Sequence, residues 1–213
     1  MNEICPAPVH EYASRFTSAD TPLLAELAAF TRKTHPQAHM LSGEIQGQFL
    51  TQISRMIQPR AILEVGTFTG YSALCLAPGL TESGELHTIE CRSEDAATAR
   101  QFFNRSLYRQ QLFLHEGLAA EIIPTINHEW DLVFLDADKT GYIDYYELIL
   151  PRMRPGAWLL ADNVLFHGQV LEEPLRGKNA KAVHAFNEHV QQDNRTEQVL
   201  LTIRDGILLI RKK

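Results

Sequence analysis

The stretch ILEVGTFTGYSALCLAPG, residues 62–79, runs from one apolar segment through a turn with two glycines into a second apolar segment. The first segment is short and ends at glycine, as a buried strand does, and the second ends at the helix-stop signal Pro78-Gly79. The stretch therefore predicts one strand–turn–helix unit, and the fold depends on whether this unit repeats.

The same alternation continues on both sides of this unit. Strands are expected at residues 60–66, 85–90, 111–117, 131–136 and 156–163, and helices at 21–36, 44–57, 71–79, 93–106, 141–153 and 181–193. Residues 198–203 and 207–212 flank the turn signal Arg204-Asp205-Gly206 and predict a hairpin. The pattern predicts an α/β fold: a doubly wound, Rossmann-like, seven-stranded, mostly parallel sheet, with a C-terminal antiparallel hairpin that adds an antiparallel edge strand.

Length and composition fit one domain, residues 1–213, with an N-terminal helical segment (1–40) and a sheet core (41–213), because 213 residues with 45% hydrophobic content fill one core. Three cysteines, Cys5, Cys75 and Cys91, form no CxxC pair, which indicates reduced thiols and a cytoplasmic location. No apolar run is long enough for a membrane span, and the N-terminus has no signal-peptide pattern. A net charge of −6 argues against nucleic acid as a partner.

Ligands of such sheets bind beyond the carboxyl ends of the strands, so the residues there indicate function. The turn from Glu64 to Ser72 lets a ligand approach the backbone at its glycines, and the following helix N-terminus favours a carboxylate. Phe68 and Tyr71 stand where the dinucleotide fingerprint GxGxxG needs glycine, so this is a different nucleoside site. Glu90 ends the next strand and suits the two hydroxyls of a ribose. Together these features predict S-adenosylmethionine, although either feature alone also fits a tight connection or a solvated glutamate.

Acidic and amide side chains end two further strands that are joined by one helix. Asp136 ends one apolar run, and Asp162-Asn163 end the next. Consecutive strands joined in this way are usually neighbours, so the three side chains are expected to converge. An all-oxygen set selects a hard divalent cation, Mg²⁺ or otherwise Ca²⁺ or Mn²⁺. A cation beside a methyl donor predicts O-methylation, because it lowers the pKa of a substrate hydroxyl.

Two charged residues follow Asp136. Lys139 is expected at the mouth of the cation site, where a neighbouring dication disfavours its ammonium form and suits it to act as a base; the alternative is a solvated lysine. Asp138 is either an N-cap of the next helix or a partner of the cofactor's ammonium group.

Six segments carry a resemblance to a known family: GQFL (47–50), LEVGTFTGYSALCLA (63–77), LVFLDADKTGYIDYY (132–146), ADNVLFHGQV (161–170), FNEHVQQD (186–193) and DGILLIRKK (205–213). In this order they resemble the cation-dependent class I S-adenosylmethionine O-methyltransferases of the caffeoyl-CoA and catechol type, over roughly residues 21–213. The resemblance implies the class I methyltransferase fold, a homodimer, and a small aromatic hydroxyl acceptor with vicinal hydroxyls.

The resemblance also implies roles for individual residues. It places the cofactor at Met40, Ser42, Glu64, Gly66, Tyr71, Ser72, Glu90, Ala119, Asp136 and Asp138. It places the cation at Asp136, Asp162 and Asn163, the catalytic groups at Lys139 and Asp136, and the acceptor at Lys139, Asn163 and His167.

Some positions depart from the family pattern and leave the acceptor open. Leu118 replaces an acidic residue near the adenine, His167 replaces an asparagine of the plant relatives, and Phe166 replaces a frequent tryptophan. The loop 171–181 carries three cations, Arg176, Lys178 and Lys181, which suit either an anionic acceptor such as a CoA thioester or plain solvation.

Other function classes fit less well. A phosphoacceptor receiver domain needs an acidic pair after the first strand, where this chain has a glycine turn, and a nucleic-acid methyltransferase needs an NPPY-type tetrapeptide. A methyltransferase fold that acts on nitrogen or a non-catechol acceptor, or only binds a ligand, is the alternative. Histidine spacing indicates no further metal site, because His35 and His39 are separated by Pro36 and because His184 and His189 fall on different helix faces. Tyr142, Tyr145 and Tyr146 are expected in the core or at an interface.

Overall fold

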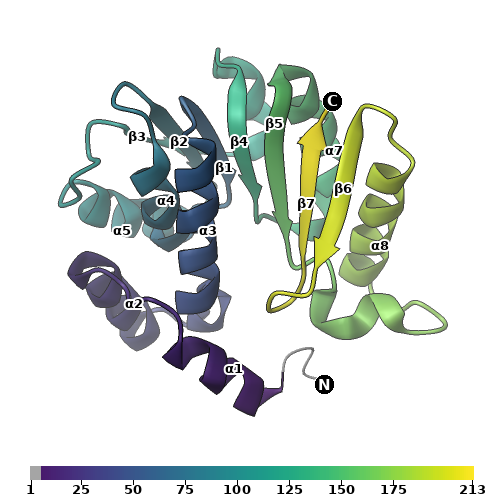
Figure 1. Ribbon diagram of the computed structural model, residues 1–213, viewed down its shortest axis with the longest axis horizontal. Helices are drawn as coiled ribbons and strands as arrows, with labels where there is room; N and C mark the ends of the chain where they lie inside the picture. The colour runs from purple at the N-terminus through teal and green to yellow at the C-terminus, as the bar shows by residue number, and fades with distance from the viewer. Residues whose placement is uncertain (1–5) are drawn as a thin grey trace.

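The computed structural model describes residues 6–213, so Cys5 lies outside the described part. Its centre is one seven-stranded sheet in the order β3-β2-β1-β4-β5-β7-β6 (Figure 1). The strands are β1 (Ala61–Val65), β2 (Glu85–Glu90), β3 (Leu112–Glu116), β4 (Trp130–Leu135), β5 (Met153–Asp162), β6 (Thr196–Leu201) and β7 (Ile207–Lys212). The predicted mostly parallel, doubly wound sheet is confirmed.

The topological switch point of the sheet, where the strand order reverses, lies between β1 and β4. Strands β1 to β5 pair in parallel, and β1 lies between β2 and β4. Loops that leave β1 and β4 at their carboxyl ends therefore diverge to opposite faces, which opens the crevice where ligands of such sheets bind.

The predicted C-terminal hairpin is confirmed, and its first strand, β6, is the edge strand. The antiparallel strand β7 is not at the edge, because it pairs with β5 on one side and with β6 on the other. Its residues Ile207, Leu208 and Ile210 are buried, whereas four consecutive residues of β6, 197–200, are exposed. The more apolar strand thus takes the inner position, and β6 is the edge.

Helices cover both faces of the sheet (Figure 1). The α-helices are α1 (Ala7–Arg15), α2 (Pro22–Thr34), α3 (Glu44–Ile57), α4 (Tyr71–Leu76), α5 (Ser93–Phe103), α6 (Ala119–Ile122), α7 (Tyr142–Ile149) and α8 (Lys178–Gln191), and the short 3₁₀ turns are η1 (Ala38–Met40), η2 (Ala77–Gly79), η3 (Ile123–Thr125), η4 (Lys139–Gly141), η5 (Leu150–Arg152) and η6 (Phe166–Leu171). One core cluster packs α2 to α5 on one face, and the other packs α7 and α8 on the opposite face. None of the described helices is long and apolar enough to cross a bilayer.

The N-terminal segment contains one helix more than the sequence predicts. Helix α1 buries none of its residues, so no apolar periodicity announces it. The next helix, α2, is capped by Thr21, whose hydroxyl accepts the N–H of Leu24. The preceding residue, Asp20, accepts the hydroxyl of Tyr71 at 2.8 Å, and this bond joins the N-terminal segment to α4.

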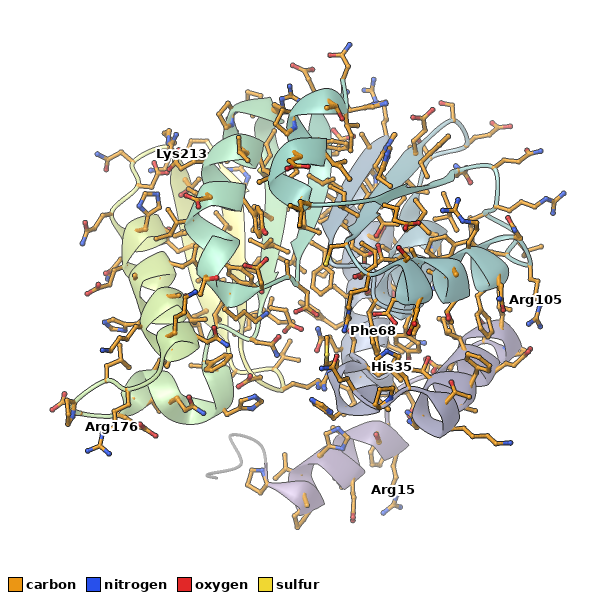
Figure 2. All side chains as sticks on the ribbon, turned by 180° about the vertical axis from the view of Figure 1, so that it is seen from behind. Arg15, His35, Phe68, Arg105, Arg176 and Lys213 are labelled. Carbon is orange, nitrogen blue, oxygen red and sulfur yellow. The ribbon has the colours of Figure 1, made fainter. Side chains whose placement is uncertain are left out.

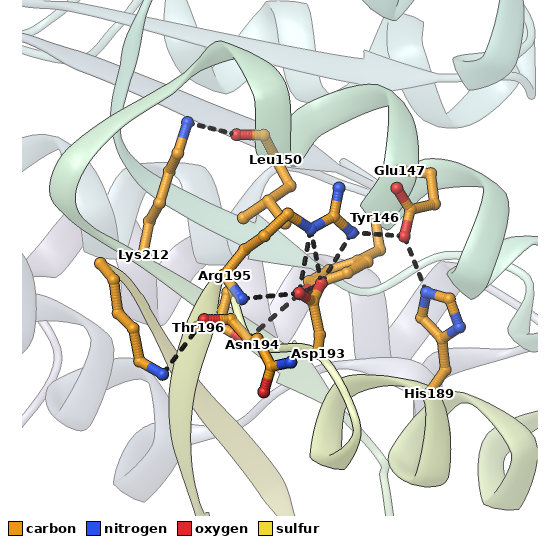
Figure 3. Close-up of polar contacts among 10 residues, drawn as sticks. Tyr146, Glu147, Leu150, His189, Asp193, Asn194, Arg195, Thr196 and Lys212 are labelled. Atoms are coloured by element: carbon orange, nitrogen blue, oxygen red, sulfur yellow. Dashed lines mark hydrogen bonds and ion pairs between the residues drawn. The ribbon is translucent and has the colours of Figure 1, made fainter.

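An ionic network fixes the end of α8 to α7 and to the start of β6 (Figure 3). Arg195 donates to the Asp193 carboxylate and at 2.7 Å to Glu147, which also contacts His189 at 2.7 Å. Tyr146 donates its hydroxyl to Asp193 at 2.8 Å. Arg195 holds the pKa of the Asp193 carboxyl well below its usual range. The contact with Glu147 therefore joins His189 of α8 to α7.

Candidate active site

A cavity of about 1030 Å³ lies at the carboxyl ends of the parallel strands, beneath the N-terminal segment. Thirteen of the fourteen predicted site residues line it: Met40, Ser42, Gly66, Tyr71, Ser72, Glu90, Ala119, Asp136, Asp138, Lys139, Asp162, Asn163 and His167. Ala7, His10 and Glu11 of α1 also line it. Figure 2 shows His35 beside Phe68 of the glycine turn, at 4.6 Å between ring centroids, where the N-terminal segment meets the sheet.

Gly66 sets the distance between the first strand and the fourth. Its φ is +101°, and a Cβ on this residue would stand 1.9 Å from the carbonyl oxygen of Asp136. The Asp136 N–H donates to the carbonyl of Val65 at 2.9 Å. Glycine at position 66 therefore lets the turn after β1 and the acidic end of β4 meet at one edge of the cavity.

Glu90 is a rigid acceptor at the end of β2 and not a solvated surface residue. It is 5% exposed, and its two oxygens accept the backbone N–H groups of Phe68 at 2.7 Å and Arg92 at 3.0 Å. Each carboxylate oxygen has a second lone pair, so the carboxylate is able to accept both hydroxyls of a ribose.

We expect Glu90→Gln to weaken S-adenosylmethionine binding by about 10- to 100-fold, because hydrogen bonds to a charged group contribute about 1.5–3 kcal/mol and 1.4 kcal/mol is a factor of ten. Glu116→Gln is the matched control, since Glu116 ends the neighbouring strand opposite Glu90 but does not line the cavity. Calorimetric titration of both variants measures the difference. Equal affinity in the two variants would remove Glu90 from the ribose.

Glu64 is the predicted site residue that does not line the cavity. It is fully buried below the turn, where it accepts the Thr88 hydroxyl at 2.5 Å. Burial raises the pKa of the Glu64 carboxyl to about 8. Oε1 of Glu64 is buried without a hydrogen-bond partner. A cationic group of a ligand bound at the glycine turn would supply that partner.

The three predicted cation ligands, Asp136, Asp162 and Asn163, line the same cavity, and Asp162 is 2% exposed. Asn163 adopts a left-handed φ of 57°, and its N–H donates to the Asp162 carboxylate at 2.9 Å. Burial, and then the nearby Asp136 charge, raise the pKa of Asp162 to about 6. Two like charges with oxygen donors around them fit a divalent cation, which would offset their repulsion.

Lys139 is bound into this cluster and is not a solvated lysine. Its side chain is 10% exposed, and its Nζ lies 3.0 Å from Oδ1 of Asp136 and 2.5 Å from the hydroxyl of Tyr142. Burial lowers the pKa of the Lys139 ammonium, but Tyr142, Asp136 and Asp162 outweigh burial and raise it above its usual value. With these neighbours alone, Lys139 is therefore protonated.

Two residues of this site escaped the sequence reasoning. Gln46 of α3 is fully buried, and its side-chain amide donates to the Asp162 carboxylate at 2.7 Å. Arg204 donates to the side-chain oxygen Oε1 of Gln46 at 2.9 Å. Gln46 lies four residues before Leu50 on the buried face of α3, so a polar residue on an apolar helical face was the available signal. The sequence around Arg204 predicts only a turn, and no residue near it in the sequence indicates a partner 158 residues away.

The remaining predicted residues lie at the rim. Asp138 is at the N-cap position of η4 without a side-chain cap bond, and it accepts the Tyr145 hydroxyl at 2.6 Å. Tyr145 lines the cavity, whereas Tyr142 and Tyr146 are core residues as expected. The His167 side chain is 56% exposed and lies 3.6 Å from Asp205.

The three cations predicted on loop 171–181 do not line the cavity, and two of them, Lys178 and Lys181, belong to helix α8. Arg176, Lys178 and Lys181 are exposed and absent from its lining, and Figure 2 shows Arg176 at the outer end of the loop. Solvation is the reading that this placement supports.

Comparison with known proteins matches residues 14–213 to the O-methyltransferase family. A catechol O-methyltransferase of Niastella koreensis is 32% identical over 160 residues, which cover 73% of this chain and 72% of that protein. A probable caffeoyl-CoA O-methyltransferase of Dictyostelium discoideum is 30% identical over 94% of this chain and 90% of its own. An SAH-bound methyltransferase of Podospora anserina matches 100% of this chain and 97% of its own with a TM-score of 0.91 at 29% identity. The chain belongs to the O-methyltransferase family and is an S-adenosylmethionine-dependent O-methyltransferase.

Proposed function

We propose that this enzyme is a divalent-cation-dependent, and specifically Mg²⁺-dependent, O-methyltransferase of small catechol-type acceptors. The observation that carries the proposal is the convergence of Asp136, Asp162 and Asn163 in the cavity that also contains Glu90 and the glycine turn. The donors are all oxygen, which suits Mg²⁺, Ca²⁺ or Mn²⁺ and not a soft metal. Relatives named as catechol and caffeoyl-CoA O-methyltransferases support the acceptor class.

The cation is proposed to bind Asp136, Asp162 and Asn163. When bound there, it would lower the pKa of an acceptor hydroxyl and favour acceptors with two adjacent oxygens. The reaction moves a methyl group from the sulfonium sulfur of S-adenosylmethionine to the acceptor oxygen, and the hydroxyl proton leaves. Lys139 and Asp136 are the proposed catalytic residues, because Lys139 Nζ stands 3.0 Å from Asp136 and faces the same cavity.

The donor site is proposed to use the residues of the turn and the neighbouring strand ends. Glu90 would bind the ribose, Ala119 would contact the adenine, and Ser72 and Gly66 would bind the amino-acid end with Glu64 beneath them. Met40, Ser42, Tyr71 and Asp138 would border the same ligand. Their common support is that all except Glu64 line one cavity.

The acceptor is proposed to lie between Lys139, Asn163 and His167. His167 is the exposed member of this set, and its backbone N–H donates to the Asp205 carboxylate at 2.5 Å. A homodimer and a cytoplasmic location stay predictions. Cys75 and Cys91 are both free, and the reduced state of the thiols also stays a prediction.

Methyl transfer from labelled S-adenosylmethionine to a panel of catechols, with Mg²⁺ or with EDTA, tests the proposal. We expect transfer to at least one catechol with Mg²⁺, a loss of at least about 100-fold with EDTA, and no transfer to the matching mono-hydroxy compounds, because a cation is worth several kcal/mol and each 1.36 kcal/mol is a factor of ten. Equal rates with EDTA would reject the cation. Cation-dependent transfer to mono-hydroxy or nitrogen acceptors would reject the catechol class alone.

A further inference from the structure

We propose that Glu85, His87 and His128 form a second metal site, which binds one Zn²⁺ at the end of the sheet opposite the candidate active site. Glu85 begins β2, whereas Glu90 ends it at the cavity, so five residues of strand, about 16 Å at 3.3 Å each, separate the two ends. Within residues 6–213, this is the one group of three His, Cys, Asp or Glu side chains with ligand atoms all within 4.8 Å of one another.

The spacing of the ligand atoms fits a tetrahedral ion. Oε2 of Glu85 lies 3.1 Å from Nε2 of His87 and 3.1 Å from Nε2 of His128. Bonds of about 2.0–2.1 Å around tetrahedral Zn²⁺ separate neighbouring ligand atoms by about 3.3 Å. Two of the three separations are therefore close to a coordination edge, and His128 lies on a connection before β4 that leaves room for the third to adjust.

His115 supports the site from behind. The Nδ1 of His87 and the Nε2 of His115 are 2.9 Å apart, and the two rings stack with centroids at 5.2 Å. A hydrogen bond at Nδ1 fixes the ring orientation and leaves Nε2 of His87 directed at Glu85 and His128, which is the arrangement that orients metal-binding histidines. Phe113 and Trp130 flank the His87 ring at 5.0 and 5.7 Å and keep its surroundings apolar.

The His87 side chain is 9% exposed, so the surrounding side chains hold its ring in place.

The chemistry of the ligands separates this site from the acidic cluster of the cavity. Two imidazole nitrogens and one carboxylate form the His₂Glu set that Zn²⁺ prefers, whereas Mg²⁺ and Ca²⁺ prefer oxygen alone. The side chains of Glu85 and His128 are about one-third exposed, so an ion has access from solvent and a water can complete its coordination. The competing explanation is a hydrogen-bonded cluster in which Glu85 simply accepts both imidazole N–H groups.

Calorimetric titration of the chelator-treated full-length protein with ZnCl₂ distinguishes the two explanations. Every titrated protein carries the two substitutions Asp136→Asn and Asp162→Asn, so that Zn²⁺ binding in the cavity does not contribute to the signal. We expect one Zn²⁺ per chain. Adding His128→Gln is expected to weaken binding by at least about 100-fold, and adding His115→Gln by about 10- to 100-fold, as loss of a supporting partner does.

His184→Gln is the matched control, because His184 also pairs with a glutamate, Glu188 at 3.5 Å, on an exposed surface far from the cluster in sequence. It is expected to bind Zn²⁺ as the parent does and to show the same Zn²⁺-dependent rise in Tm, which His128→Gln loses. No one-to-one binding, or equal affinity in the His128→Gln and His184→Gln proteins, would overturn the proposal. Because His128 is partly exposed, its substitution leaves the core of the protein in place.

Discussion

Asp162→Asn is expected to lower kcat/KM by about a thousandfold while the affinity for S-adenosylmethionine stays within about threefold of the wild type. Asp162 is the most buried of the proposed cation ligands, and an amide in its place removes one of two negative charges. Loss of several kcal/mol of charge stabilisation corresponds to about three factors of ten. Steady-state kinetics with Mg²⁺ and calorimetry with S-adenosylmethionine measure the two quantities separately.

The same substitution is expected to stabilise the metal-free protein. The pKa of Asp162 is raised from 3.8 to about 6, so its ionisation costs about 3 kcal/mol in the folded state above pH 6, and this cost disappears below about pH 4. One of the bonds from Gln46 and Asn163 is lost in the amide, at about 1 kcal/mol. Urea unfolding in EDTA should therefore show a net gain of about 2 kcal/mol at pH 7.5 and a net loss of about 1 kcal/mol at pH 4.

Asp144→Asn is the control, since Asp144 is an exposed carboxylate on α7 outside the cavity. It should change neither activity nor stability by more than a small factor. A Asp162→Asn enzyme with full Mg²⁺-stimulated activity would remove Asp162 from the cation site. A variant that is both inactive and less stable than the wild type would instead indicate a structural role for the carboxylate.

The sheet and most of the cavity could be predicted because their residues lie in recognisable local sequence patterns. Each parallel strand is a short apolar run, and Asp136, Asp162 and Glu90 each follow such a run directly. Once the strands are parallel, their carboxyl ends meet at one edge, so strand-end position alone brings these residues together.

The features that the sequence did not reveal depend on contacts between distant segments. Helix α1 buries none of its residues, so no apolar pattern in its own sequence predicts it. Arg204 reaches Gln46, and Gln46 reaches Asp162, across more than a hundred residues of chain, and no periodicity encodes such a path. His87, His115 and His128 come from two strands and a connection, and they become neighbours only through the register that pairs His87 with Phe113 in β3.

Lys139→Met is expected to lower kcat by about 10²- to 10⁴-fold, the range for losing a general base, with little change in S-adenosylmethionine affinity. A second explanation is that Lys139 only holds Asp136 and Tyr142 in place through its contacts at 3.0 and 2.5 Å. Lys139→Arg separates the two, because arginine keeps the positive charge but stays protonated at all accessible pH values. If Lys139 removes the proton, the arginine variant should retain stability and remain as slow as the methionine variant.

The acceptor itself provides the sharper measurement. A catechol with an electron-withdrawing nitro group has a more acidic hydroxyl and depends less on a protein base, so the loss in Lys139→Met should shrink for nitrocatechol relative to catechol. An equal loss for both acceptors would assign Lys139 to positioning, since a displaced Asp136 penalises every acceptor alike. The raised pKa of Lys139 in its present surroundings makes this comparison decisive, because those charges favour the protonated form. If Lys139 is the base, it needs another positive charge to offset Asp136 and Asp162, and its effect should vanish together with the cation in EDTA.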